Sequence, residues 1–268
     1  MELSSVGFTH QGGTRDHNED AWRAWPEAGL WLVVDGMGGH SAGDVASRII
    51  CDTVSQDLAY YGAAAYDTGR LEQSLQAANE AVRDYGARSL NGGTLGATLV
   101  ALQIREGRYR LLWAGDSRCY RLRSQQLEQL SEDHSQVNDL IRAGMLSRDR
   151  ARGHPMAHVV TRAVGVEPRI ELERAEGQAL PGDLFMLCSD GVSDEFGDQE
   201  LHGFLANSSL QDANDAILYS ALVNKCSDNI TCLLVKAETS GYHSPVIREA
   251  RDPDATIPVR IPQRTTQG

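Results

Sequence analysis

The sequence predicts a single α+β domain. Segments with strand-like patterns come in blocks, as do segments with helical patterns, instead of alternating strictly along the chain. The chain has 268 residues, of which 41% are hydrophobic, and this suits one sizeable core. We find no internal repeat. The expected domain is therefore residues 1–236, followed at 237–268 by a tail that contains four prolines and scattered charges.

Apolar runs predict the strands, and apolar residues at helical spacing predict the helices. The segments 94–104, 108–114 and 117–123 are joined by short links, so we expect them to form an antiparallel meander. The other expected strands are 2–9, 21–25, 29–34, 170–174, 183–188 and 230–235. The expected helices are 41–60, 70–87 with Thr68 as N-cap, 135–143, 147–152, 198–206 and 210–224.

Carboxylates recur where these apolar runs begin or end. Asp35 follows the run 30–34, Asp116 and Asp190 follow two later runs, and Asp228 comes just before another. A carboxylate at the edge of a buried sheet is costly unless it is paired or binds a metal. Few cationic residues lie near these acids in the sequence. Because carboxylate and backbone oxygens are the ligands available, the pattern favours Mg²⁺ or Mn²⁺ over zinc or copper.

Several short motifs rich in acids and glycines follow one another along the chain. They are Gly12–Asp20, Asp35–His40, Gly93-Thr94, Ala114–Arg118, Asp133–Ser135, Ser189–Gly191 and Ser227–Thr231. In this order they resemble the bacterial branch of the metal-dependent Ser/Thr protein phosphatases, the PPM or type 2C family. The resemblance spans roughly residues 9–235, and the motifs together are far more specific than any one of them.

The resemblance implies both a fold and an activity. The fold would be a four-layer α/β/β/α sandwich, in which two antiparallel sheets lie face to face and helices cover both outer faces. The activity would be hydrolysis of phosphoserine and phosphothreonine by metal-activated water at a binuclear Mg²⁺ or Mn²⁺ centre. Such an enzyme opposes a Ser/Thr kinase. In length the chain is similar to stand-alone members that act in type VI secretion.

The resemblance also implies roles for individual residues. Asp35 would bridge both ions, and the Gly36 carbonyl would bind one of them. Asp190 and Asp228 would complete the coordination of the other ion. Glu19 and Asp20 would contact the ions through metal-bound waters. Asp116 and Asp194 would bind a third ion, and Asn229 would orient a water molecule.

Two side chains are candidates for handling the substrate. Arg15 would clamp the phosphate, because a guanidinium matches its oxygens with two prongs; the alternative is a solvated loop arginine. Many eukaryotic members carry a histidine where Met37 stands, so His40 is the nearest candidate for the general acid. The alternative for His40 is a bracing role, and for His134 we expect a structural role.

Composition and charge limit the competing functions. The net charge of −12 argues against a nucleic-acid partner and disfavours an anionic membrane surface. We expect no signal peptide, no membrane span and, from five cysteines without a Cys-x-x-Cys pair, a reducing cytoplasm. We also expect a monomer. The alternative functions are a two-metal phosphatase for small molecules and an inactive regulator that binds phosphopeptides, which the intact acids disfavour.

The tail offers one candidate recognition segment. Thr256 would be a phospho-acceptor, with Val259 three residues beyond it, and this spacing resembles what forkhead-associated modules accept. We expect the tail either to be a disordered extension or to tether the domain to such a partner, raising the local concentration of substrate.

Overall fold

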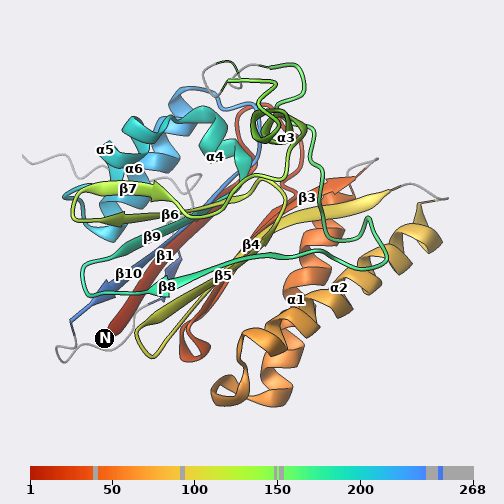
Figure 1. The fold of residues 1–268 in the computed structure, drawn as a ribbon, viewed down its shortest axis with the longest axis horizontal. Coiled ribbons are helices and arrows are strands. Elements are labelled where there is room, and N and C mark those ends of the chain that lie inside the picture. The colour runs from red at the N-terminus through yellow and green to blue at the C-terminus, as the bar shows by residue number, and fades with distance from the viewer. Residues whose placement is uncertain (39–41, 91–93, 148–149, 151–153, 240–246, 250–268) are drawn as a thin grey trace, which may run out of the picture.

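Two β-sheets pack face to face, and helices cover both outer faces (Figure 1). The computed structural model describes residues 1–268 apart from 39–41, 91–93, 148–149, 151–153, 240–246 and 250–268. The expected four-layer sandwich is therefore confirmed.

The first sheet has five antiparallel strands in the order β2-β3-β4-β5-β8. Helices α1 (Gly43–Tyr61) and α2 (Thr68–Ser89) cover its outer face. Two short 3-10 helices, Pro26–Ala28 and Ala63–Ala65, lie at the opposite end of the sheet from the acids. The strands are β2 (Asp20–Trp25), β3 (Leu30–Gly38), β4 (Leu95–Arg105), β5 (Arg108–Ala114) and β8 (Glu173–Gln178).

The second sheet has six strands in the order β11-β1-β10-β9-β6-β7. Its pairs are antiparallel except that β11 runs parallel to β1. The strands are β1 (Glu2–His10), β6 (Arg118–Arg123), β7 (Gln126–Gln129), β9 (Leu184–Cys188), β10 (Ile230–Glu238) and β11 (Ile247–Glu249). The helices on this side are α4 (Asp190–Glu195), α5 (Asp198–Leu205) and α6 (Leu210–Val223), while α3 (Gln136–Arg142) lies at one end.

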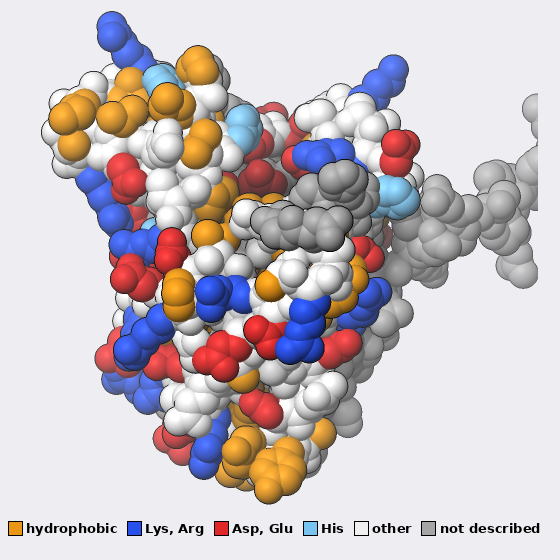
Figure 2. Space-filling model, turned by 90° about the vertical axis from the view of Figure 1, so that its right-hand side faces the viewer, with side chains coloured by type: hydrophobic (Ala, Val, Ile, Leu, Met, Phe, Trp, Pro, Cys, Tyr) orange, Lys and Arg blue, Asp and Glu red, His pale blue; other side chains and the backbone are white. Residues whose placement is uncertain are grey.

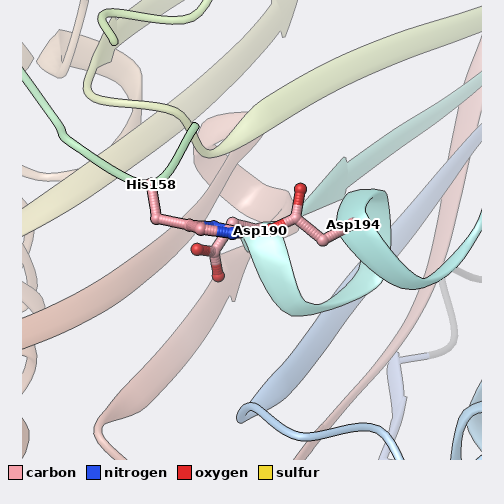
Figure 3. A group of neighbouring side chains, drawn as sticks. All are labelled: His158, Asp190 and Asp194. Atoms are coloured by element: carbon pink, nitrogen blue, oxygen red, sulfur yellow. Dashed lines mark ion pairs between the residues drawn. The ribbon is translucent and has the colours of Figure 1, made fainter. Parts of the chain in front are cut away.

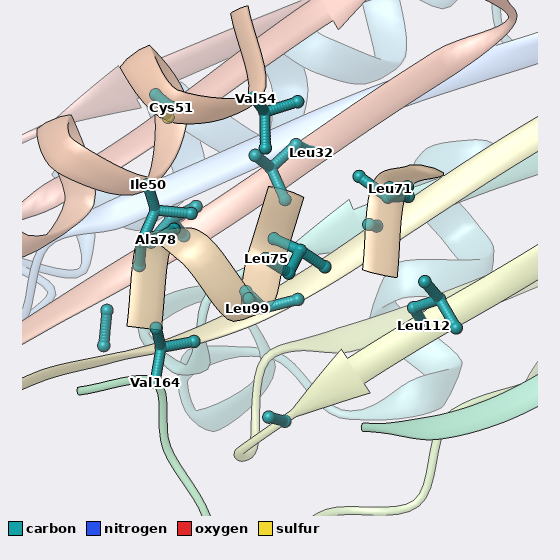
Figure 4. Packing of buried hydrophobic residues seen from close by; sticks show 14 of the residues in the cluster. Leu32, Ile50, Cys51, Val54, Leu71, Leu75, Ala78, Leu99, Leu112 and Val164 are labelled. Carbon is teal, nitrogen blue, oxygen red and sulfur yellow. The ribbon is translucent and has the colours of Figure 1, made fainter. Parts of the chain in front are cut away.

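The central strands are buried on both faces, which explains their unbroken apolar runs. In β4, Leu99 faces α1 and α2, whereas Val100 faces the other sheet. Figure 4 shows the outer layer, where Ile50 of α1 and Leu75 of α2 pack over Leu32 and Leu99. Each fully buried aliphatic side chain contributes roughly 1.5–3 kcal/mol of transfer free energy, so these layers hold the sandwich together.

The predicted meander is wrong at its third strand. Strands β4 and β5 pair as expected, but β6 crosses to the other sheet and pairs with β7 and β9. The crossing occurs at Gly115, which has φ of 112° and whose Cβ, if it had one, would lie 2.3 Å from the Cβ of Thr98. Only glycine fits this turn. The crossing places Asp116 between the two sheets.

Other boundaries differ from the expectation in smaller ways. The N-cap of α2 is Asp67, whose side chain accepts the Arg70 N–H, and not Thr68. The strand expected at 170–174 lies later, at β8, and both β7 and α4 were missed. The helix expected at 147–152 falls largely outside the described residues.

Strand β10 also runs two residues into the predicted tail. Ala237 is fully buried and pairs with Leu3, so the folded part extends beyond residue 236. Strand β11 then adds three more residues of the tail to the sheet edge. The candidate segment around Thr256 lies outside the described residues. In the described part of the chain, no helix combines the length and the apolar character needed to cross a bilayer.

Candidate metal centre

The predicted acids meet at one end of the sandwich. Asp20 begins β2 and pairs directly with Asp35 near the end of β3. Asp190 follows β9 as the first residue of α4, and Asp228 comes two residues before β10. The two sheets are joined at this point, because the Ser189 hydroxyl donates to Asp20 Oδ2 over 2.7 Å. Sequence segments far apart are thereby brought to one site.

Asp20 and Asp35 lie in surroundings that oppose their negative charge. Burial raises the pKa of Asp20 to about 7, although bonds from Thr231 and Ser189 lower it. Burial, followed by the charges of Asp20, Asp190 and Asp116, raises the pKa of Asp35 well above its ordinary value. The carboxylates are therefore close enough to repel one another.

The same causes act on the two acids contributed by the other segments. Burial and then the charges of Asp194 and Asp228 raise the pKa of Asp190 to about 6. Burial and then the charge of Asp190 raise the pKa of Asp116 well above its ordinary value. A group of buried carboxylates with these pKa values is stabilised by any cation that neutralises them. The donor atoms are oxygens, so the residues fit Mg²⁺ or Mn²⁺.

We expect the metal-free protein to lose stability as the pH rises from about 4 to about 7. In this window the folded state holds protons that the unfolded state has released, because the pKa values of Asp20 and Asp190 lie above an unfolded value of about 3.9. Urea denaturation in EDTA should show a smaller unfolding free energy at pH 7.5 than at pH 5. Saturating Mn²⁺ should reduce the difference. Equal stability at both pH values in EDTA would contradict this expectation.

Glu19 and Gly36 lie where strand β3 meets the start of α1. The Gly36 N–H donates to the Glu19 carbonyl over 3.1 Å. The Glu19 Oε1 atom accepts the Gly43 N–H over 2.9 Å, so this carboxylate also caps α1. A Cβ on Gly36 would lie 2.1 Å from the Gly43 carbonyl oxygen. Glycine is therefore required at this position by the close approach of two backbones.

Asn229 braces the N-terminal loop, while its expected role in orienting water stays a prediction. Its Oδ1 accepts the Glu19 N–H over 2.9 Å. Its Nδ2 donates to the carbonyls of Gln11 and His17, each over 2.9 Å. These bonds tie the N-terminal loop, which carries Arg15, to the start of β10. Both ends of the amide are used in this way, so the structure favours Asn229 as a brace for the loop.

His134 has the structural role expected of it. Its Nδ1 accepts the Gly115 N–H over 3.1 Å, and its Nε2 lies 2.7 Å from Glu173 Oε2. The ring is therefore the Nε2–H tautomer, which donates to Glu173. Burial lowers its pKa, in keeping with a neutral ring. His134 thus holds the turn that presents Asp116.

A second brace on this turn is an ion pair. Arg118 contacts Asp133 through Nε at 2.9 Å and through Nη2 at 2.7 Å. These two residues also line a cleft of about 1150 Å³ beside the acids, whose other walls include Asp190, Asp194 and Glu200. Figure 2 shows the corresponding end of the molecule as a hollow with acidic side chains at its floor. The segment 135–161, without its undescribed residues 148–149 and 151–153, is here called the flap. It contributes six residues to the lining of the cleft: Ser135, Val137, Asn138, Ile141, Ala157 and His158.

The structure adds one residue that the sequence did not single out. His158 of the flap points toward Asp190 and Asp194 (Figure 3), and its Nδ1 lies 3.2 Å from Asp194 Oδ2. Helix α4 was missed from the sequence, although the spacing of Asp190 and Asp194 places both on one helix face. No local signal could reveal His158, because a fold across 32 residues brings it to α4.

Of the two candidates for handling the substrate, the structure describes Arg15 but not His40. Arg15 donates from Nη2 to Asp228 Oδ2 over 2.7 Å, and its side chain is about half exposed. His40 lies outside the described residues. All five cysteines are buried and free, and burial raises the pKa of the Cys188 thiol to about 12. The cysteines therefore lie in the core and not at the surface of the acidic cleft.

The two-sheet sandwich with a carboxylate cluster at one end defines a class of metal-dependent phosphatases. The family model of protein phosphatase 2C matches residues 9–224. The chain therefore belongs to the protein phosphatase 2C family.

Individual members of the family are also similar to it. A serine/threonine phosphatase stp of Listeria monocytogenes is 33% identical over 86% of this chain and 94% of that protein. Among solved structures, PppA, a key regulatory component of T6SS in Pseudomonas aeruginosa, is 42% identical. The TM-score is 0.77, with 88% of this chain and 98% of that chain covered. The catalytic domain of serine threonine protein phosphatase PstP, in complex with 2 manganese ions, is 27% identical at a TM-score of 0.78, with 88% and 99% covered.

Proposed function

We propose that this chain is a phosphoprotein phosphatase that hydrolyses phosphoserine and phosphothreonine at a binuclear Mn²⁺ or Mg²⁺ centre. The observation that carries the proposal is the convergence of Asp20, Asp35, Asp116 and Asp190, from both sheets, on one all-oxygen site. The PstP structure with two manganese ions supports the identity of the metal. When bound, the ions would supply Lewis acidity and lower the pKa of a water molecule.

The protein's own residues would bind the metal ions and orient the substrate phosphate. Asp35, Asp190 and Asp228, with the Gly36 carbonyl, would hold the two core ions, while Asp20 and Glu19 contribute through water. The bond from Ser189 fixes the direction of the Asp20 carboxylate. Arg15 would bind the phosphate, because its guanidinium has five N–H donors and the bond to Asp228 uses one of them. The phosphate would then lie between Arg15 and the ions.

The experiment that tests this function is release of phosphate from a phosphothreonine peptide. We expect release with Mn²⁺ and none after treatment with EDTA. A sugar phosphate offered under the same conditions should react far more slowly. The small-molecule alternative predicts the reverse order of the two substrates. The inactive-regulator alternative predicts binding of the phosphopeptide with no release of phosphate.

We expect Arg15→Ala to raise KM for the phosphopeptide roughly tenfold and to lower kcat less. A charge-assisted bond to phosphate is already formed in the ground state, and such a bond is worth roughly 1.5–3 kcal/mol. Steady-state kinetics with Mn²⁺ would measure both constants. Arg88→Ala is the matched control, because Arg88 pairs only with the surface Asp84 in α2 among the contacts described. An unchanged KM for Arg15→Ala would instead support the alternative, in which Arg15 is a solvated loop arginine.

The biological setting follows from the same proposal. A phosphatase of this specificity opposes a Ser/Thr kinase, and the similarity to PppA supports a part in controlling a type VI secretion system. The tail beyond residue 249 would serve as a tether, with Thr256 and Val259 recognised by a forkhead-associated protein. The support for the tether is the sequence pattern alone.

A further inference from the structure

The acidic cleft extends beyond the residues proposed to hold metal. Its lining runs from Asp116 and Asp190, in the metal centre, to residues 196–200, which we call the α5 wall. The volume of about 1150 Å³ is far larger than a metal ion needs. Since the cleft begins at the metal centre, it would receive the part of a substrate chain next to the phosphorylated residue. The side chains in the cleft therefore bear on which flanking residues the enzyme accepts.

The charge of the lining is strongly negative. Among the described residues that line the cleft, carboxylates are numerous, and Arg118 is the only arginine or lysine. Asp116 adds a buried negative charge. This residue is only 6% exposed, and the described part of the chain gives its side chain no hydrogen bond or ion pair to another residue. A buried carboxylate without a partner is costly unless a cation neutralises it, so the cleft favours positively charged ligands.

Two acids on one side of the cleft already have cationic partners. Asp133 pairs with Arg118, and Glu132 pairs with Arg142. All four residues belong to the stretch of chain from the start of β6 to the end of α3. Their charges cancel in pairs, so this side offers little attraction to a further cation.

The acids of the α5 wall are in a different position. Asp198 and Glu200 stand in the first turn of α5, both exposed, and in the described part of the chain neither has a cationic partner. Acids at this position stabilise the N-terminus of a helix, and Glu200 Oε2 also accepts the Gly197 N–H over 3.0 Å. These roles leave the remaining carboxylate oxygens available to a ligand.

Apolar side chains line the cleft as well. They are Leu130, Val137, Ile141 and Phe196. Lysine and arginine have a matching composition, since an apolar stem carries their cationic head. A bare metal ion takes oxygen ligands and gains nothing from apolar walls. The mixed lining therefore indicates a basic side chain as the ligand.

We propose that the α5 wall binds a basic residue of the substrate, so that the enzyme prefers phosphoserine or phosphothreonine with arginine or lysine nearby. Asp198 and Glu200 would pair with the cationic head, while the stem packs on the apolar part of the lining. Arginine should be preferred to lysine, because a guanidinium matches a carboxylate with two parallel bonds. This inference rests on the proposed function and adds to it the class of substrate sequence.

The test compares two phosphothreonine peptides that differ only in their flanking residues. One carries arginine and the other glutamate at the same positions, two to four residues from the phosphothreonine on each side. With Mn²⁺ we expect kcat/KM to be ~10-fold higher for the arginine peptide, since each exposed ion pair changes binding by up to about fivefold. Equal kcat/KM values would overturn this inference and leave the proposed function standing. No release from either peptide would refute the proposed function, and this inference with it.

Asp198→Lys should abolish the preference and bring the ratio of the two kcat/KM values close to one. Asp52→Lys is the matched control, because Asp52 is exposed on α1 and does not line the cleft, while the substitution changes the net charge by the same amount. This control should keep the wild-type ratio. Equal shifts in both variants would show that the overall negative charge attracts the peptide, and the α5 wall would then not be a binding site.

Asp198→Asn guards against a disturbed helix, because asparagine keeps the size of the side chain and removes only its charge. We expect this variant to lower the ratio by up to about fivefold with no change in melting temperature. Raising the salt concentration from about 0.1 M to about 1 M should lower the wild-type ratio too, because the Debye length falls from about 10 Å to about 3 Å. An Asp198→Asn protein with both the wild-type melting temperature and the wild-type ratio would overturn the inference.

Discussion

Replacing Asp35 with asparagine is expected to lower Mn²⁺-dependent phosphate release by roughly a thousandfold. Asp35 lies at the centre of the carboxylate group, paired with Asp20 and close enough to Asp190 and Asp116 for their charges to raise its pKa. It is the residue proposed to bridge both core ions. An amide cannot bridge two cations, and the ions supply several kcal/mol of transition-state stabilisation, at 1.36 kcal/mol per factor of about ten.

The same substitution should leave the metal-free fold at least as stable as the wild type. Asparagine removes one negative charge from a group whose members repel one another. Melting temperatures in EDTA would show whether the loss of activity reflects chemistry and not unfolding. Asp67→Asn is the matched control, because Asp67 caps α2 at the surface and asparagine caps equally well. Activity of Asp35→Asn within a few-fold of the wild type would refute the bridging role.

Gly36→Ala is expected to damage both the fold and the metal centre. The added Cβ would lie 2.1 Å from the Gly43 carbonyl oxygen and 2.6 Å from the Glu19 carbonyl oxygen. Both obstacles are backbone atoms, so no side-chain rotation relieves them. Overpacking of this kind costs about 1–3 kcal/mol, and the displaced Glu19 and Gly36 carry proposed ligands. We expect a lower urea midpoint together with weaker Mn²⁺ binding by calorimetry.

Gly203→Ala is the matched control for this substitution. Gly203 lies in α5 with no atom within 4 Å of its virtual Cβ, so alanine should stabilise the helix by about 1 kcal/mol. The two variants thus make the same chemical change and should shift the urea midpoint in opposite directions. A Gly36→Ala protein with the wild-type urea midpoint would show that β3 and α1 can move apart without loss of unfolding free energy, and would contradict this expectation.

Much of the fold could be predicted because the strands are long and apolar. The strand expected at 29–34 forms most of β3, which continues to Gly38, and 108–114 was predicted with the bounds of β5. Helical spacing likewise located the ends of α1 and α2 to within two residues. The sequence placed the start of the tail at residue 237, whereas β10 continues to Glu238 and β11 adds Ile247–Glu249 to the sheet. The pattern could not show this, because Ala237 is buried through pairing with β1, at the other end of the chain.

Four of the candidate acids were also visible in the sequence, since each stands where an apolar run begins or ends: Asp35, Asp116, Asp190 and Asp228. The pattern of apolar runs could not show which residues contact these side chains in the folded protein. The bond from Ser189 to Asp20, the use of Glu19 to cap α1 and the hold of Asn229 on the N-terminal loop all join segments distant in sequence. Each depends on how elements that are far apart in the sequence pack against one another.

The sequence by itself determined the family resemblance, the α+β class and the identity of the acids, because motif order and apolar periodicity are local properties of the chain. Only the tertiary structure decided that β6 leaves the first sheet at Gly115, which places Asp116 between the layers. Only the tertiary structure also brought His158 of the flap to Asp194. Both outcomes depend on packing between elements that are far apart in sequence, and such packing leaves no periodic trace in the residues themselves.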